Sequence, residues 1–302
     1  MTILLHGGKV RAMKTRFQSQ ICSKCSTVYD GLASRCPHCD EPSSDEGTKK
    51  FDHFLHLPLV RQVGLFFLGW AGFQLIAVIL SLIFQTAWAA ANPGFTPEMA
   101  EEYVHSASYS APVHFIAYTL LFGFLTLLLW KDNLLVLKSF KNKKGWLIGL
   151  SGFAALFVLQ LVYGNVVSLI LKAFGLELQS NANENALNVL TKAYPVLSVL
   201  IFGFVAPYCE ELTYRAGLFS FFGRIGKWAS YVLSALVFGL IHFDWTCFGD
   251  TDALLIELYN LPVYIMAGVI LGYVYDKGGF NASLTTHVLN NLLSTIATIF
   301  AE

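Results

Sequence analysis

The sequence is poor in charged residues, which make up 13% of its 302 positions, against about a quarter in an average soluble domain. The 20 acidic and 20 basic residues give a formal net charge of zero, so the charge balance gives no indication of a nucleic-acid partner. Hydrophobic residues instead make up 55% of the chain, with a mean hydropathy of +0.55. This composition predicts an all-α polytopic membrane protein.

Long apolar runs are the strongest structural signal in the chain. About 20 consecutive apolar residues cross a bilayer as a helix, and most of the runs reach or approach this length. The run at 229–243 is short and predicts a thin or partly buried helix. We therefore expect about seven transmembrane helices. The runs are 63–90, 112–130, 146–171, 195–222, 229–243, 254–275 and 283–301.

The loops between these runs differ in basic residues. With a cytosolic amino terminus, the inner loops at 131–145, 223–228 and 276–282 carry eight Lys or Arg, whereas the outer loops carry two. Basic residues accumulate in cytoplasmic loops. The sequence therefore predicts a multi-pass protein whose amino terminus is cytosolic.

Cysteine is scarce except near the amino terminus, where four of the six cysteines form two close pairs. Two Cys-x-x-Cys knuckles can wrap one tetrahedral zinc ion. Two disulfides would be the alternative, and these need an oxidising compartment. The predicted cytosolic location favours a structural zinc ribbon. Its ligands would be Cys22, Cys25, Cys36 and Cys39.

The ribbon divides the chain into segments. Residues 1–21 are expected to be a mobile basic arm, 22–39 the ribbon, 40–60 a polar linker and 61–302 the transmembrane domain. Within that domain, the Asn-rich stretch 176–194 is expected to connect two spans, either as a plain loop or as a short helix capping the bundle.

Three ionisable residues interrupt the run at 195–222. Insertion scales assign roughly 2.5–3.5 kcal/mol to a charged residue at the bilayer centre, so Glu210, Glu211 and Arg215 together cost on the order of 8–10 kcal/mol before they pair. Such a cluster indicates a functional site. Pro207 lies just before it and cannot donate to the carbonyl of Gly203, which predicts a kink unless it is an ordinary membrane-helix proline.

Helical spacing separates the roles of the two glutamates. Glu211 and Arg215 are four residues apart and can pair on one helical face, whereas adjacent residues point about 100° apart. Glu210 therefore remains free for acid–base chemistry. A purely structural network of buried charges is the alternative.

Two later spans add polar side chains. His242 ends the run at 229–243, where an isolated histidine would more often be an interfacial or core residue. His287 and Asn291 share a helical face, and Asn290 points to a neighbouring one. A carboxylate, two histidines and an amide fit either metal ligation or direct activation of water with oxyanion stabilisation.

These residues resemble the three-motif signature of the CPBP intramembrane proteases, which include the CAAX prenyl endopeptidases and the bacteriocin-processing or immunity proteins called Abi. The resemblance covers residues of about 145–300 and implies an all-helical membrane peptidase. It also implies that the Glu211–Arg215 pair holds the site together. The motifs are Glu210-Glu211-x-x-x-Arg215, Phe238-x-x-x-His242 and His287-x-x-x-Asn291.

By this resemblance, Glu210 is the general base that activates water, His242 assists it, and His287 and Asn291 stabilise the oxyanion. The family has been described both as metalloproteases and as metal-independent glutamate proteases. The implied substrates are peptides or proteins, which can be lipid-modified. The zinc ribbon lies outside the family core and could recruit a cytosolic partner.

Two other classes of function compete with a peptidase. A non-catalytic scaffold or bacteriocin-immunity protein could keep the site residues and act by binding. A transporter could line an ion path with the buried charges, but here they cluster in one span and no inverted repeat is evident.

Overall fold

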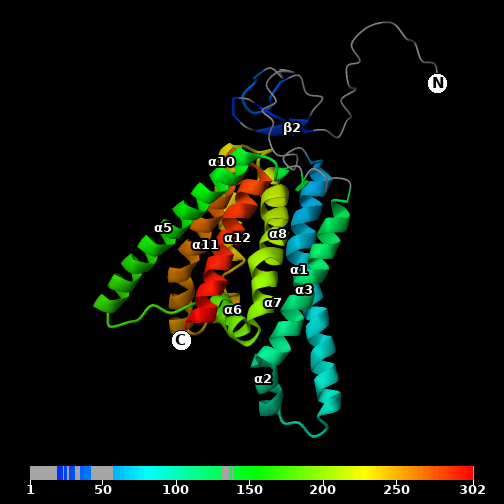
Figure 1. The fold of residues 1–302 in the computed structure, drawn as a ribbon, viewed down its shortest axis with the longest axis vertical. Helices are drawn as coiled ribbons and strands as arrows, with labels where there is room; N and C mark the ends of the chain where they lie inside the picture. The colour runs from blue at the N-terminus through cyan, green and yellow to red at the C-terminus, as the bar shows by residue number, and fades with distance from the viewer. Residues whose placement is uncertain are drawn as a thin grey trace, which may run out of the picture.

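A computed structural model describes residues 19–22, 24–25, 27–30, 35–41, 57–130, 136–137 and 139–301. These residues form a helical bundle, above which lies a small cysteine-rich hairpin (Figure 1). The predicted mobile arm falls outside the described residues except for 19–21, and so does most of the predicted linker.

The bundle contains α-helical, π-helical and 3₁₀-helical elements. A single long helix from Pro195 to Phe222 is built from α- and π-helical stretches. In chain order the elements are α1 (Leu59–Ala91), α2 (Pro97–His105), α3 (Ala107–Leu128), α5 (Lys143–Ala173), α6 (Ala182–Ala193), α7 (Pro195–Leu200), η2 (Ile201–Val205), α8 (Ala206–Glu210), η3 (Glu211–Phe219), α9 (Ser220–Phe222), α10 (Lys227–Leu240), η4 (Trp245–Cys247), α11 (Thr251–Gly278) and α12 (Phe280–Phe300).

Five helices among the described residues are long and apolar enough to cross a membrane: α1, α3, α5, α11 and the helix at 195–222. The predicted multi-pass helical fold is therefore confirmed. The count of about seven stays a prediction. The 14-residue α10 extends only about 21 Å, less than a bilayer's hydrocarbon core of about 30 Å, and the polar-rich α12 is not among the five.

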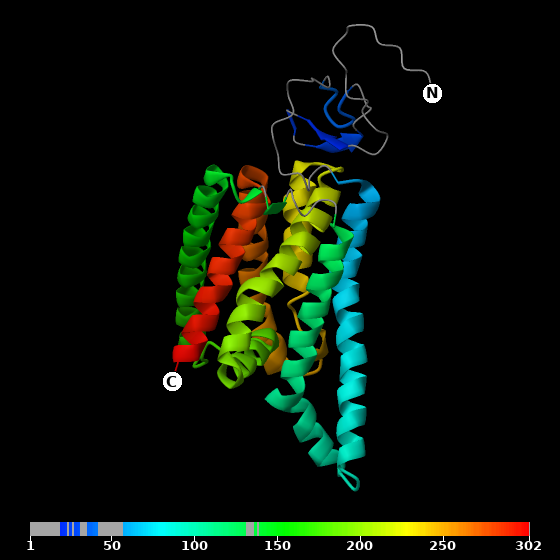
Figure 2. The same cartoon turned by 45° about the vertical axis from the view of Figure 1, so that its right-hand side comes forward.

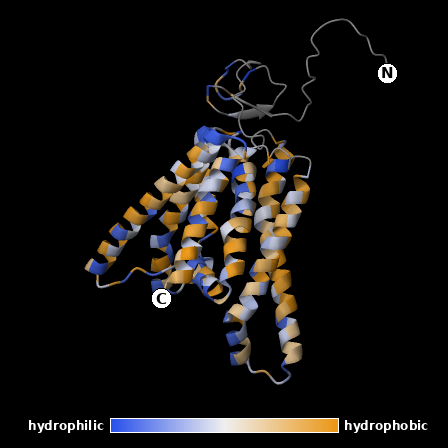
Figure 3. Cartoon of the chain, in the orientation of Figure 1, coloured by the Kyte–Doolittle hydropathy of each residue, from blue (hydrophilic) through white to orange (hydrophobic). Residues whose placement is uncertain are grey.

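The apolar surface of the bundle faces outward. Large hydrophobic side chains are exposed along α1 and α5, for example Leu75, Leu82 and Leu169, and hydrophobic residues cover these helices while hydrophilic ones gather near their ends (Figure 3). A water-soluble protein buries such side chains against a core. Here lipid is the solvent that they meet.

Helix α5 packs closely against α11 and α12. On α5, three glycines at helical spacing face α12 and α11, and a Cβ atom on any of them would collide with side chains or backbone there. Small residues of this kind let membrane helices approach closely. This close approach places α12 beside the interior of the bundle. The glycines are Gly145, Gly149 and Gly152.

The helix at 195–222 widens where a kink was predicted. The Ala206 N–H bonds to the Ile201 carbonyl, five residues back, and Pro207 follows it within α8. A second π-helical stretch, η3, begins at Glu211. π-helical turns change which residues face the interior, and they occur often at functional sites.

The polar stretch at 176–194 contains a helix rather than only a loop. Asn181 caps α6 by accepting a hydrogen bond from the Glu184 N–H. This helix lies at the end of the bundle away from the hairpin (Figures 1 and 2).

The hairpin itself consists of β1 (Ser19–Ile21) and β2 (Val28–Asp30), which pair antiparallel with Gln20 opposite Tyr29. One backbone hydrogen bond spans each Cys-x-x-Cys pair. The Cys22 N–H bonds to the Thr27 carbonyl, and the Cys36 N–H bonds to that of Glu41.

Candidate active site and metal centre

The charged residues of η3 form a buried ion pair. Arg215 Nε lies 3.4 Å from Glu211 Oε2, four residues earlier, and the two side chains are 1% and 0% exposed. The guanidinium also lies over the Phe238 ring, 4.7 Å from its centroid. Through the contact of Arg215 with Phe238, the ion pair of η3 also packs against α10 inside the bundle.

His287 of α12 lies between the two glutamates. Its Nδ1 is 2.8 Å from Glu211 Oε1, and its Nε2 is 3.6 Å from Glu210 Oε2. The first contact is a hydrogen bond that fixes the ring. The second nitrogen is therefore directed at the carboxylate that the helical spacing leaves free of Arg215.

Glu210 has a further partner that sequence reasoning missed. The Tyr118 hydroxyl of α3 donates to Glu210 Oε1 at 3.4 Å. Tyr118 is 92 residues away in the chain and is one of 13 tyrosines. No local pattern in the sequence distinguishes it.

His242 completes the cluster from the end of α10. Its Nδ1 lies 2.7 Å from the Phe238 carbonyl, so Nδ1 is the protonated nitrogen and Nε2 stays available. The ring stacks on Tyr264 with centroids 4.5 Å apart. Tyr264 is itself held by Asn181 and Asn183, through hydrogen bonds of 3.2 Å each. His242 is therefore oriented from two sides.

Asn291 bonds to the widened part of the long helix. Its amide donates to the Phe202 carbonyl at 3.1 Å. The Ala206 N–H already bonds to Ile201, and the next residue, Pro207, has no N–H to donate. Asn291 thus satisfies a carbonyl that the helix leaves open, and one amide hydrogen remains.

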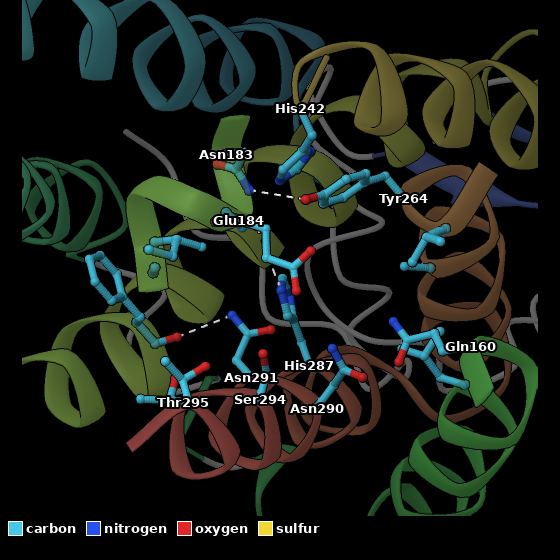
Figure 4. Close-up of a pocket in the computed structure, with 18 of the residues that line it drawn as sticks. Gln160, Asn183, Glu184, His242, Tyr264, His287, Asn290, Asn291, Ser294 and Thr295 are labelled. Atoms are coloured by element: carbon cyan, nitrogen blue, oxygen red, sulfur yellow. Dashed lines mark hydrogen bonds and ion pairs between the residues drawn. The ribbon is translucent and has the colours of Figure 1, made fainter. Parts of the chain in front are cut away.

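A cavity of about 250 Å³ connects these residues. Glu210, His242, His287 and Asn291 all line it, whereas Glu211 and Arg215 do not. Figure 4 shows His242, His287 and Asn291 around this space, with Tyr264 next to His242. The structure therefore brings four of the six candidate residues to one cavity and places the ion pair behind them.

One wall of the cavity is anchored by a buried carboxylate that was not among the candidates. Glu257 of α11 is 3% exposed, and it accepts hydrogen bonds from the backbone of Ala182 at 3.0 Å and of Asp244 at 3.2 Å. It thereby ties the start of α6 to the segment that follows His242.

The four amino-terminal cysteines form a separate site. Their sulfur atoms all lie within 4.8 Å of one another, with Cys22 and Cys39 3.4 Å apart and Cys25 and Cys36 3.5 Å apart. These separations exceed the disulfide length of about 2 Å and are near the ~3.8 Å that tetrahedral Zn–S bonds of ~2.3 Å impose. The cluster could hold a metal ion.

The thiols of this cluster differ in acidity. Although desolvation opposes it, side-chain and backbone hydrogen bonds with Thr27 lower the pKa of Cys25 to about 6. The pKa of Cys39 is raised to about 12. The Glu41 N–H favours its thiolate, but desolvation and the hydrogen bonds with Cys25 and Cys22 together outweigh that effect. A bound cation would ionise all four, because thiolates are the metal-binding form.

The fold and the cavity define a class: a multi-pass helical membrane protein with a carboxylate–histidine site between its helices. The comparison with known families gives a specific match within that class. Residues 192–293 match the family model described as "Type II CAAX prenyl endopeptidase Rce1-like". The predicted resemblance to CAAX-type proteases is confirmed over this segment, which contains all three motifs.

Two bacterial proteins are similar to part of the chain. An uncharacterized protein of Mycoplasma capricolum subsp. capricolum is 29% identical over 174 residues, which are 54% of this chain and 48% of that protein. The UPF0177 protein YvdC of Lactococcus lactis subsp. lactis is 27% identical over 146 residues, 48% of this chain and 50% of that protein. The chain thus spans about half the length of the curated relatives it matches. No solved structure matches it.

Proposed function

We propose that the chain is an intramembrane endopeptidase of the CAAX-protease type, which hydrolyses a peptide bond with water activated by Glu210. The observation that carries the proposal is the position of His287, held between Glu210 and Glu211 at the wall of a cavity inside the bundle. The match of residues 192–293 to a family of prenyl endopeptidases supports it.

In the proposed reaction, Glu210 accepts a proton from water as the oxygen attacks the carbonyl carbon of the peptide bond. The proton then passes to the leaving amine. His242 assists with Nε2, since its Nδ1 is occupied by the Phe238 carbonyl. Tyr118 holds the Glu210 carboxylate in place.

His287 and Asn291 are the proposed oxyanion donors. Asn291 keeps one amide hydrogen besides the one bonded to Phe202. Glu211 orients the His287 ring through Nδ1, and His287 lines the cavity. A preorganised donor of this kind is worth about 2.7–4 kcal/mol of barrier.

Glu211 and Arg215 are proposed as positioning residues. They are buried behind the cavity, where Glu211 orients His287 through Nδ1. In the proposed domain organisation, the transmembrane domain covers 61–302 and its peptidase core about 145–300.

No step of this proposal passes through a metal. Among the described residues, the four cysteines are the one group of three or more His, Cys, Asp or Glu ligands whose donor atoms converge. Glu210, His242 and His287 do not form such a group.

The test of the function is turnover of fluorogenic single-span peptides by the protein in proteoliposomes, with and without a chelator. We expect cleavage that a chelator does not abolish, both in the wild type and in a Cys36→Ser variant. Absence of cleavage would favour the alternative function, a non-catalytic scaffold that keeps the site residues and acts by binding. Loss on chelation, restored by metal, would make Glu210, His242 and His287 metal ligands.

We further propose that the cysteine cluster binds one structural zinc ion. Replacing Cys36 by serine removes a thiolate ligand, so zinc content should fall from one ion per chain to none. Elemental analysis of the purified protein measures this. The matched control is Cys247→Ser, a buried cysteine far from the ribbon in sequence, which should keep its zinc. A wild-type protein without zinc contradicts the proposal.

The ribbon and the basic loops are proposed to face the cytosol. Lys143 begins α5 and Glu101 lies in α2, and both are exposed. The start of α5 and helix α2 lie at opposite ends of the bundle (Figure 1). In a background without natural cysteines, a membrane-impermeant maleimide applied to intact cells should label Glu101→Cys and not Lys143→Cys. Labelling of position 143 would reverse the orientation. A cytosolic ribbon would be free to recruit a partner or substrate.

A further inference from the structure

The cavity changes character along its length. At its catalytic end, Leu156, Phe238 and Leu271 line it and belong to a buried apolar cluster. The side chains that α6 and α12 contribute to the lining are mostly polar, from the carboxamides beside His287 to the hydroxyls on the last turns of α12. Both segments lie at the end of the bundle away from the ribbon (Figures 1 and 2).

Six carboxamides from four helices line this space, together with three hydroxyls of α12. Carboxamides present a donor and an acceptor at once, as a peptide group does, so they can pair with both the N–H and the C=O of an extended chain. The carboxamides are Gln160, Asn183, Asn188, Asn260, Asn290 and Asn291, and the hydroxyls are those of Ser294, Thr295 and Thr298.

Two of these carboxamides are uncommitted. Within the described part of the chain, Gln160 and Asn290 have no hydrogen-bond partner. The other four, Asn183, Asn188, Asn260 and Asn291, each bond to a neighbour. Asn290 lies beside His287 and Asn291 in Figure 4, and Gln160 faces the same space from α5. Free amides next to a catalytic cluster are available to a substrate.

The charge of the lining also restricts what can bind. It contains Glu184 and Glu210 but no Lys or Arg. A CAAX tail ends in a free carboxylate three residues beyond a prenylated cysteine, and nothing in this lining offers that anion a cation. An isoprenoid chain here would cover the free amides without replacing their water, which is unfavourable.

We infer that this cavity binds a lipid-free, polar segment of peptide, neutral or cationic, and that the substrate is not a prenylated carboxyl-terminal tail. The inference rests on the proposed peptidase function. The scissile bond lies at the apolar, catalytic end, and the polar segment extends along the amides toward the end of the bundle away from the ribbon.

The experiment measures binding separately from cleavage. The Glu210→Gln protein in nanodiscs is titrated with a fluorescent 12-residue peptide of Lys, Asn, Ser and Gly that has an amidated carboxyl terminus. A second probe has the same length, a free carboxylate and an S-farnesyl cysteine followed by three residues. Empty nanodiscs correct for partitioning into lipid.

We expect saturable binding of the lipid-free probe, weakened roughly fivefold by Asn290→Leu or Gln160→Leu, the effect of losing about one net hydrogen bond. The control is Asn165→Leu, an exposed amide of α5 outside the cavity, which should bind like the parent. No binding of the lipid-free probe, or tighter binding of the farnesylated probe that neither leucine variant weakens, overturns the inference.

Cleavage of both probes by the wild type distinguishes this inference from the function on which it rests. Preferred cleavage of the farnesylated probe would refute the inference and leave the peptidase intact. If the lipid-free probe binds, the leucine variants weaken that binding, and neither probe is cleaved, then the peptidase function is refuted while the proposed binding site is supported.

Discussion

Replacing Glu210 by glutamine should lower peptide turnover by roughly 10²–10⁴-fold, the usual loss when a general base is removed. The amide has the shape of the carboxylate and its oxygen can still accept the hydrogen bond of Tyr118, but it cannot take a proton from water. The fold should survive, because an amide is cheaper to bury than a carboxylate.

Turnover and thermal midpoint are measured together for this variant in detergent and in proteoliposomes. Glu177→Gln is the matched control, because Glu177 is an exposed carboxylate between α5 and α6 that does not line the cavity. It should behave like the wild type. A stable Glu210→Gln protein that cleaves at the wild-type rate would remove Glu210 from the role of base.

The same substitution one residue later should have a different effect. Glu211→Gln leaves the buried Arg215 guanidinium without its counter-charge, and breaking one side of a buried pair costs about 3–5 kcal/mol. It also weakens the bond that orients His287. Stability and turnover should therefore fall together, whereas Glu210→Gln affects turnover alone.

A double variant separates the two effects of Glu211. Glu211→Gln combined with Arg215→Met removes both charges, so the thermal midpoint should recover relative to Glu211→Gln alone. Turnover should stay low because His287 still lacks its carboxylate. If the single and double variants were equally stable, the pair would not be what the substitution destabilises.

Much of the fold follows from hydrophobic runs. The run at 63–90 lies within α1, that at 146–171 within α5 and that at 254–275 within α11. Spans of this kind are set by local composition, since every backbone group in lipid must bond within its own helix. The Glu211–Arg215 pair could be predicted from the sequence for a similar reason, because helical geometry alone brings residues i and i+4 together.

The rest of the site depends on contacts between distant segments. Tyr118 meets Glu210, Asn291 meets the Phe202 carbonyl and Glu257 caps α6 across separations of 92, 89 and 75 residues. Periodicity within a helix carries no information on which helix lies opposite. The π-helical turns add to this, because they shift the facing residues away from a regular 3.6-residue pattern.

The pairing of Glu211 with Arg215 within one helix has a consequence for how the protein is made. Chains are synthesised from the amino terminus, so the helix at 195–222 leaves the ribosome before α12 exists and before His287 can contact Glu211. Each unpaired charge opposes entry into the bilayer by about 2.5–3.5 kcal/mol. A partner four residues away is already present when the helix enters. The ion pair therefore lets this helix insert before α12 is made, and the catalytic histidine joins a site in which the charges of Glu211 and Arg215 already balance each other.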